Sequence, residues 1–197
     1  ERAAILGRFC EAFESHGDAI AEELTWQMGR PLRYAPSEVR GTLERARHMI
    51  AIAPAALADI DAGPKAGFHR FLRREPLGVV FTVAAWNYPY LIAVNSVVPA
   101  LMAGNVVVLK HSAQTPLCAE RFEECLREAG LPEGAFQALH LSHTDTERVI
   151  GDRRVDFVAF TGSVSMQSGF CPLLALYCAM VAAIIDLPTP PLPCKTM

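Results

Sequence analysis

Three short polar segments follow apolar runs in this 197-residue sequence, and each offers chemistry that a ligand site can use. Trp86-Asn87 follows FTVAA, Lys110-His111-Ser112 follows NVVVL, and Thr161-Gly162-Ser163 follows VDFVAF. A rigid side-chain amide can stabilise an oxyanion, and a lysine can bind a phosphate or a ribose. A small turn leading into a helix can hold a pyrophosphate on its free N–H groups.

Each segment also has a purely structural interpretation. Asn87 suits a turn, because asparagine tolerates turn geometry and Pro89 stops the strand from continuing. A lone Lys110 suits a charge that leaves a strand for solvent, and Thr161-Gly162-Ser163 suits an ordinary helix N-cap. The residues by themselves leave both interpretations of each segment open.

The elements that must position these segments alternate along the second half of the chain. Strands are predicted within 78–85, 105–110, 136–141 and 155–160, and helices within 89–104, 115–130 and 142–151. Short β-branched runs between helices predict an α/β fold with a parallel sheet and helices on its faces. Ligands bind beyond the carboxyl ends of such strands, so the three polar segments are expected to meet at one site.

Helical patterns precede this region. Residues 1–60 carry apolar residues at roughly helical spacing, and a break at Gly29-Arg30-Pro31 separates a first segment from a second over about 37–58. Residues 62–67 are predicted to form a turn-rich connector. Two extended segments, broken at Glu75-Pro76, follow the connector.

Composition narrows the function classes. A net charge of −3 with scattered arginines gives no electrostatic basis for binding nucleic acid. Six cysteines without a CxxC pair are interpreted as reduced thiols of a cytoplasmic protein. The first residues lack the apolar run of a signal peptide and do not begin with Met. They resemble the interior of a helix, so we expect the true beginning to be missing.

The sequence lacks the standard nucleotide-binding motifs and contains only a weak candidate for a metal site. The sequence has no GxG glycine pair and no Gly-Lys pair, which excludes the usual dinucleotide fingerprint and the P-loop. His140, His143 and Asp145 could bind a metal, but a helix cap by Ser142 or Thr144 explains the same stretch, and no metal site is predicted.

Three ordered motifs, WNYP, VVVLKHSAQTP and VAFTGSVS, resemble the aldehyde dehydrogenase superfamily. The flanking pieces ELTWQMGRP, REPLGVV and VNSVVPALMAGN are similar to it as well, and WQMGRP leans towards the succinate-semialdehyde dehydrogenase branch. The resemblance covers about residues 1–165. It implies a Rossmann-like domain without the usual glycine fingerprint, NAD or NADP as cofactor, an aldehyde substrate oxidised to a carboxylic acid, and a homo-oligomer.

The resemblance also implies residue roles. Asn87 matches the side-chain donor to the substrate oxyanion, and Lys110 matches the residue that holds the adenosine ribose or its phosphate. The other cofactor-binding positions are Trp86, Ser112, Gly162 and Ser163. Ala113 stands where the family usually has an acidic residue that binds the ribose, so NADP use stays open beside NAD.

After Ser165 the family character stops. Residues 166–197 form an apolar, proline-rich tail, and the family's catalytic cysteine and glutamate segments are missing. Gln167 replaces a family glycine, and a shifted reading frame or an alternative exon is our hypothesis for the tail. Cys171 has no neighbouring cation to lower its pKa, so it is not expected to be the nucleophile.

These departures predict an incomplete aldehyde dehydrogenase fold that is inactive alone. The alternative is a non-catalytic dinucleotide-binding fragment or a partial subunit. A membrane-tethered module would depend on residues 170–185, which are too short to span a bilayer and are interrupted by Pro172, so no membrane partner is expected.

Overall fold

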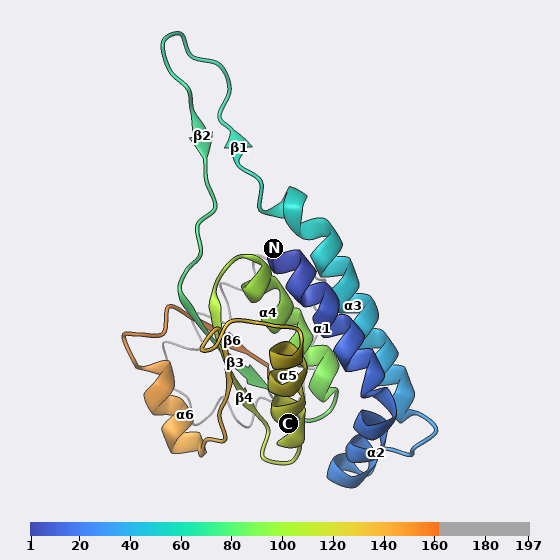
Figure 1. Cartoon of the computed structure of the whole chain (residues 1–197). Helices are drawn as coiled ribbons and strands as arrows, with labels where there is room; N and C mark the ends of the chain where they lie inside the picture. Colours follow the sequence, from blue (N-terminus) through green and yellow to red (C-terminus); the bar gives the residue numbers. More distant parts are fainter. Residues whose placement is uncertain (162–197) are drawn as a thin grey trace, which may run out of the picture. The chain divides into compact units, whose positions relative to one another are not determined.

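A computed structural model describes residues 1–161 of the chain (Figure 1). The elements follow the order α1 (Arg2–Ser15), α2 (Gly17–Met28), α3 (Ala35–Ala56), β1 (Ile60–Asp61), β2 (Phe71–Leu72), β3 (Val79–Ala84), α4 (Pro89–Met102), β4 (Val106–His111), α5 (Leu117–Glu128), β5 (Phe136–Ala138), α6 (His143–Ile150) and β6 (Phe157–Phe160).

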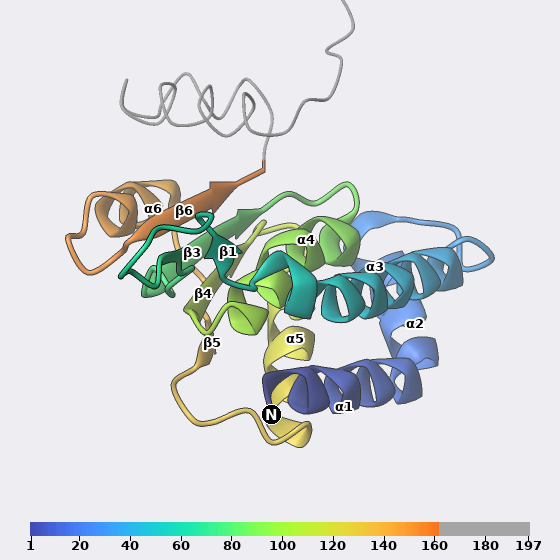
Figure 2. The ribbon, with the colours of Figure 1, turned by 90° about the horizontal axis from the view of Figure 1, so that it is seen from above.

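Four of the strands form one sheet in the order β5-β4-β3-β6, and every neighbouring pair is parallel. α4 and α5 lie on one face of this sheet and α6 lies on the other (Figure 2). Right-handed crossovers require this arrangement, because the chain moves outward through β4 and β5 and then returns past β3 to β6. The predicted α/β fold, with a parallel sheet covered by helices on both faces, is confirmed.

The helices α1 and α3 pack on α4 and α5, so they form a second layer behind the sheet rather than contacting it directly (Figure 2). Buried aromatic rings join the layers. The rings of Phe9 and Phe122 stack with their centroids 5.8 Å apart, and Phe13 meets Tyr90 edge-on at 5.1 Å. This apolar contact fixes the helical layer on the helices that cover the sheet.

The first predicted helical segment is two helices, so the prediction of one segment up to Gly29 is wrong. His16 ends α1 by donating its backbone N–H to the Ala12 carbonyl, and its own carbonyl accepts the N–H of Ile20 in α2. The turn between the helices keeps the apolar spacing nearly regular, which explains why the pattern looks continuous. Gly29 ends α2 with φ of 71°, a left-handed conformation that glycine adopts without strain.

The connector at 62–67 forms the tip of a hairpin that extends away from the helices (Figure 1). Its strands β1 and β2 have two residues each and pair antiparallel, with Ile60 opposite Leu72. The extended segment predicted before Glu75-Pro76 is therefore only partly a strand. Pairing across the tip was not visible in the local pattern.

Other boundaries differ by smaller amounts. β5 ends at Ala138, so the predicted strand over 136–141 is too long. Pro99 lies within α4, close to its end, and Gly130 follows α5 with φ of 78°. None of the helices within residues 1–161 combines the length and the apolar character needed to cross a membrane. The predicted boundary between residues 165 and 166 lies outside the described residues and stays a prediction.

Candidate functional site at the carboxyl end of the sheet

The strand order places the candidate site. The chain leaves β3 towards β4 on one side and returns to β6 on the other, so the order reverses between β3 and β6. Such a reversal in a parallel sheet is where ligands bind, beyond the carboxyl ends of the strands. Val83 is paired with both Lys110 and Phe160, and its carbonyl accepts the N–H of Thr161 at 2.9 Å. The ends of all three predicted segments therefore meet at this edge.

Lys110 is buried at the end of β4, with 3% of the residue exposed. The interpretation as a charge leaving the strand for solvent is therefore wrong. Burial lowers the pKa of Lys110, because the charged form loses its hydration. No carboxylate among residues 1–161 forms an ion pair with it. A largely buried lysine without an ion-pair partner favours an anionic or oxygen-rich ligand.

Asn87 lies in the exposed turn between β3 and α4, beside the exposed ring of Trp86. Its backbone carbonyl accepts a hydrogen bond from Arg30 Nη2 at 2.8 Å. Its side-chain amide makes no hydrogen bond with another residue in the described part of the chain. The turn interpretation thus holds for the backbone, and the side-chain amide is exposed and unbonded within residues 1–161.

Arg30 and Glu38 support this turn, and sequence reasoning missed both. Glu38 Oε2 accepts a hydrogen bond from Arg30 Nη1, and its Oε1 accepts the backbone N–H of Tyr90 at 2.9 Å. Arg30 is 57 residues away from Asn87 in the sequence. The only local signal is an acidic residue in a helix that follows a Gly-Arg-Pro break, which does not identify the partner.

His111 fixes the same turn from the sheet side. Its Nε2–H donates to the Pro89 carbonyl at 3.1 Å, and its Nδ1 accepts from Ser112 N–H and from the Thr115 hydroxyl, both at 3.0 Å. The Pro89 carbonyl can only accept, so Nε2 carries a proton, and the Ser112 N–H can only donate, so Nδ1 carries none and the ring is neutral. Burial is the main cause that lowers the pKa of His111 to about 4.

The remaining predicted positions follow β4, as Ser112 does, or follow β6, as Gly162 and Ser163 do. Ser112 is half-buried, and its hydroxyl accepts the N–H of Gln114 at 3.3 Å. Ala113 is exposed beside it and brings no carboxylate. Gly162 and Ser163 lie outside the described residues, so their predicted contact with a pyrophosphate stays a prediction.

The stretch from His140 to Asp145 follows the carboxyl end of β5, the strand next to β4. His140 Nε2 bonds Glu120 at 2.9 Å, and Asp145 pairs with Arg148, so the stretch from His140 to Asp145 forms no ligand cluster within residues 1–161. Ser142 caps α6 by accepting the N–H of Asp145 at 3.1 Å, as one of the two capping interpretations predicts.

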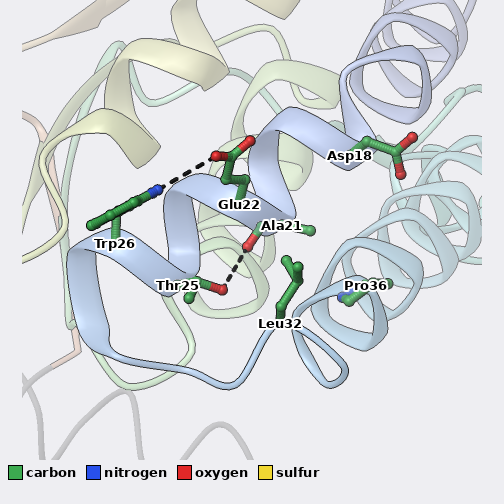
Figure 3. Close-up of a pocket in the computed structure, with 7 residues that line it drawn as sticks. All are labelled: Asp18, Ala21, Glu22, Thr25, Trp26, Leu32 and Pro36. Carbon is green, nitrogen blue, oxygen red and sulfur yellow. Dashed lines mark hydrogen bonds between the residues drawn. The ribbon is translucent and has the colours of Figure 1, made fainter.

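A pocket opens between α2 and the loop that leads to α3 (Figure 3). It is lined by Asp18, Ala21, Glu22, Thr25, Trp26, Leu32 and Pro36. Its polar groups are engaged locally, since Trp26 Nε1 points to Glu22 at 3.5 Å and the Thr25 hydroxyl donates to the Ala21 carbonyl. None of the predicted site residues lines it.

The described cysteines are free, buried thiols, which agrees with the reduced state predicted for them. Burial raises the pKa of Cys118 and that of Cys125 to about 12, and it also raises the pKa of Cys10. A thiolate is the nucleophilic form of cysteine, so these three thiols are poor nucleophiles at neutral pH.

Comparisons with known proteins give a consistent assignment. The sequence model of the aldehyde dehydrogenase family matches residues 1–169. A succinate-semialdehyde dehydrogenase [NADP(+)] of Mycobacterium avium (strain 104) is 36% identical over 165 residues, which are 83% of this chain and 35% of that protein.

Solved structures share the fold. The succinic semialdehyde dehydrogenase of Streptococcus pyogenes, solved in complex with NADP+, aligns with a TM-score of 0.75 at 30% identity over 80% of this chain and 34% of its own. An NAD-dependent benzaldehyde dehydrogenase of Corynebacterium glutamicum aligns with a TM-score of 0.78 at 26% identity over 86% and 36%. The chain thus spans about a third of the length of the relatives that it matches.

Proposed function

This chain belongs to the aldehyde dehydrogenase family, and from that premise we propose that it binds NAD or NADP at the carboxyl end of its sheet and serves the oxidation of an aldehyde to a carboxylic acid. Lys110 would hold the adenosine ribose or its phosphate. Asn87 would donate its side-chain amide to the oxyanion that forms on the aldehyde carbon. The dinucleotide, when bound, supplies the hydride acceptor.

The observation that carries this proposal is Lys110, a buried residue without an ion-pair partner among residues 1–161, at the end of the strand beside β3. Leaving a charge without a partner in the described structure costs stability, and such a cost is typical of groups kept for a ligand. Trp86 follows β3 and Ser112 follows β4, and both would complete the cofactor contacts together with Gly162 and Ser163.

Both cofactors remain part of the proposal. Relatives with NADP(+) in their names and a benzaldehyde dehydrogenase described as NAD-dependent share the family and the fold. Ala113 supports acceptance of NADP, because a carboxylate there would repel the additional phosphate.

A second candidate, dinucleotide binding without turnover, is favoured by the thiols. The three described cysteines are buried with raised pKa values, so none of them is suited to attack an aldehyde. The finer parts of the assignment, an aldehyde partner, a homo-oligomer and a cytoplasmic location, are proposals as well. The free thiols support the location, since disulfides are rare in the cytosol.

The test is a calorimetric titration of the full chain with NAD+ and with NADP+, repeated with Lys110→Met. A charge-assisted contact is worth about 1.5–3 kcal/mol, so the variant should bind on the order of ten- to a hundredfold more weakly. Methionine suits a buried site without needing a partner, so the melting temperature should stay equal or rise.

Lys65→Met is the matched control, because Lys65 is exposed on the hairpin tip and should leave both affinities unchanged. Absence of binding in the unaltered chain, or equal binding by the Lys110→Met chain, would exclude the proposed role. Production of NADH or NADPH on adding aldehyde would separate turnover from binding alone.

A further inference from the structure

Arg30 and Glu38 form an ion pair that is almost completely removed from water. Their side chains are 12% and 0% exposed, respectively. Neither residue is among the positions expected to bind the cofactor or the substrate. A buried ion pair loses much hydration on folding and often adds little net stability, which is consistent with a role other than stabilisation.

The pair binds the chain on both sides of Pro89. On one side, Arg30 Nη2 donates to the Asn87 carbonyl at 2.8 Å, and the guanidinium carbon lies 4.9 Å from the centre of the Tyr88 ring. On the other side, Glu38 Oε1 accepts the N–H of Tyr90 at 2.9 Å. The two charges thus hold the turn that leads from β3 into α4.

This contact replaces a cap that α4 does not have. Tyr88, at the N-cap position, offers no side-chain hydrogen bond to the first turn of the helix. The carboxylate of Glu38, which belongs to α3, supplies the missing acceptor and also meets the positive end of the helix dipole. The turn that carries Asn87 is therefore held from outside its own segment, by Arg30 and Glu38 on one side and by His111 on the sheet side.

We propose that Arg30 and Glu38 are positioning residues for Asn87. This inference rests on the proposed function, in which the Asn87 amide stabilises an oxyanion. Such donors act only when they are held within about 0.5 Å of the productive position. Arg30 holds the carbonyl of Asn87 itself, and Glu38 holds both Arg30 and the start of α4.

The experiment measures the mobility of Asn87 directly. The chain has three asparagines, Asn87, Asn95 and Asn105, so labelling with 15N-asparagine gives a spectrum with three backbone amide signals. In the unaltered chain the backbone N–H of Asn87 should have an order parameter near the rigid value of about 0.85. Asn105 is an internal reference, because its side chain is bonded to the backbone N–H groups of Leu77 and Gly78.

Arg30→Ala should lower the Asn87 order parameter below about 0.6 while Asn105 stays rigid. Arg30→Lys should restore most of the rigidity, because an ammonium group keeps the ion pair with Glu38. Glu38→Gln should loosen Asn87 as well, since the neutral amide no longer holds the guanidinium. If Arg30→Ala does not fold, Glu38→Gln decides the question by the same comparison.

The matched control is Arg121→Ala, which breaks a half-buried ion pair with Glu23 between α5 and α2 and removes no hydrogen bond of the turn. Equal loosening of Asn87 in this control would show a general loss of stability and would overturn the proposal. An Asn87 amide that stays rigid in the folded Arg30 and Glu38 variants, or is mobile in the unaltered chain, would overturn it too. Failure of the unaltered chain to bind NAD+ and NADP+ would instead contradict the proposed function and leave the order parameters interpretable.

Discussion

At the residue scale, the neighbours Lys110 and His111 are both buried, but they differ in whether the chain supplies partners for their polar groups. Successive residues of a strand point to opposite faces of the sheet, so the two side chains enter different surroundings. His111 is satisfied by the Pro89 carbonyl, the Ser112 N–H and the Thr115 hydroxyl. Lys110 has no ion-pair partner within residues 1–161. The hydrogen bonds of His111 are thus satisfied within the chain, whereas Lys110 is suited to a ligand.

We expect His111 to make stability depend on pH between about 6.5 and about 4. In the folded chain the pKa is lowered to about 4, chiefly by burial, with the nearby charge of Lys110 acting in the same direction. The unfolded chain binds a proton below about pH 6.5 while the folded chain does not, so the free energy of unfolding falls as the pH falls. The loss should reach roughly 3 kcal/mol by pH 4 and then level off.

Urea unfolding at several pH values measures this slope. His111→Gln should flatten it, because glutamine does not titrate and its amide can still donate towards the Pro89 carbonyl. The exposed His48→Gln is the matched control and should keep the slope of the unaltered chain. Equal slopes in the His111→Gln chain and the unaltered chain would contradict the assignment.

At the element scale, the helices begin and end for different reasons. α6 has a local cap from Ser142, whose hydroxyl accepts the N–H of Asp145. α4 has no cap within its own segment and receives one from Glu38 in α3. α1 and α2 share His16, whose N–H closes one helix and whose carbonyl opens the next. The boundaries at Ser142 and His16 depend on residues next to the helix, whereas the start of α4 depends on a residue of another helix.

Ser142→Ala should lower the free energy of unfolding by about 0.5–2 kcal/mol, because it leaves an N–H in the first turn of α6 without its acceptor. Thr144→Ala is the control, since Thr144 is exposed within the first turn and caps nothing. Chemical denaturation of both variants compares the two capping interpretations. A larger loss for Thr144→Ala would contradict the assignment of the cap to Ser142.

At the scale of the whole described unit, the aromatic cluster joins the helical layer to the layer that covers the sheet. Phe122 is fully buried in α5, and its ring lies within 6.5 Å of the ring centres of Phe9, Phe13, Tyr90 and Phe136. These four rings belong to α1, α4 and β5. A single side chain therefore contacts three elements besides its own, and its loss affects all of them.

Phe122→Ala should cost about 3–5 kcal/mol, because it removes buried apolar surface and leaves a cavity among rigid neighbours. That is a large share of the 5–15 kcal/mol typical of a domain, so the midpoint of thermal unfolding should fall by at least several degrees. Leu117→Ala on the same helix is the control, because Leu117 is 37% exposed and should cost well under half as much. Comparable losses in the two variants would contradict the role of the cluster.

The sequence by itself determined the α/β alternation, the family and the end of a helix at Gly130, and it narrowed the cap of α6 to Ser142 or Thr144, because each depends on residues that are close together in the chain. Lys110 was recognised as a candidate, but its burial was not, since burial depends on what the fold places around a strand end. The pairing of Arg30 with Asn87, and that of Glu38 with Tyr90, was decided only by the tertiary structure. Those partners are 57 and 52 residues apart, and the way α3 packs on α4 brings them together.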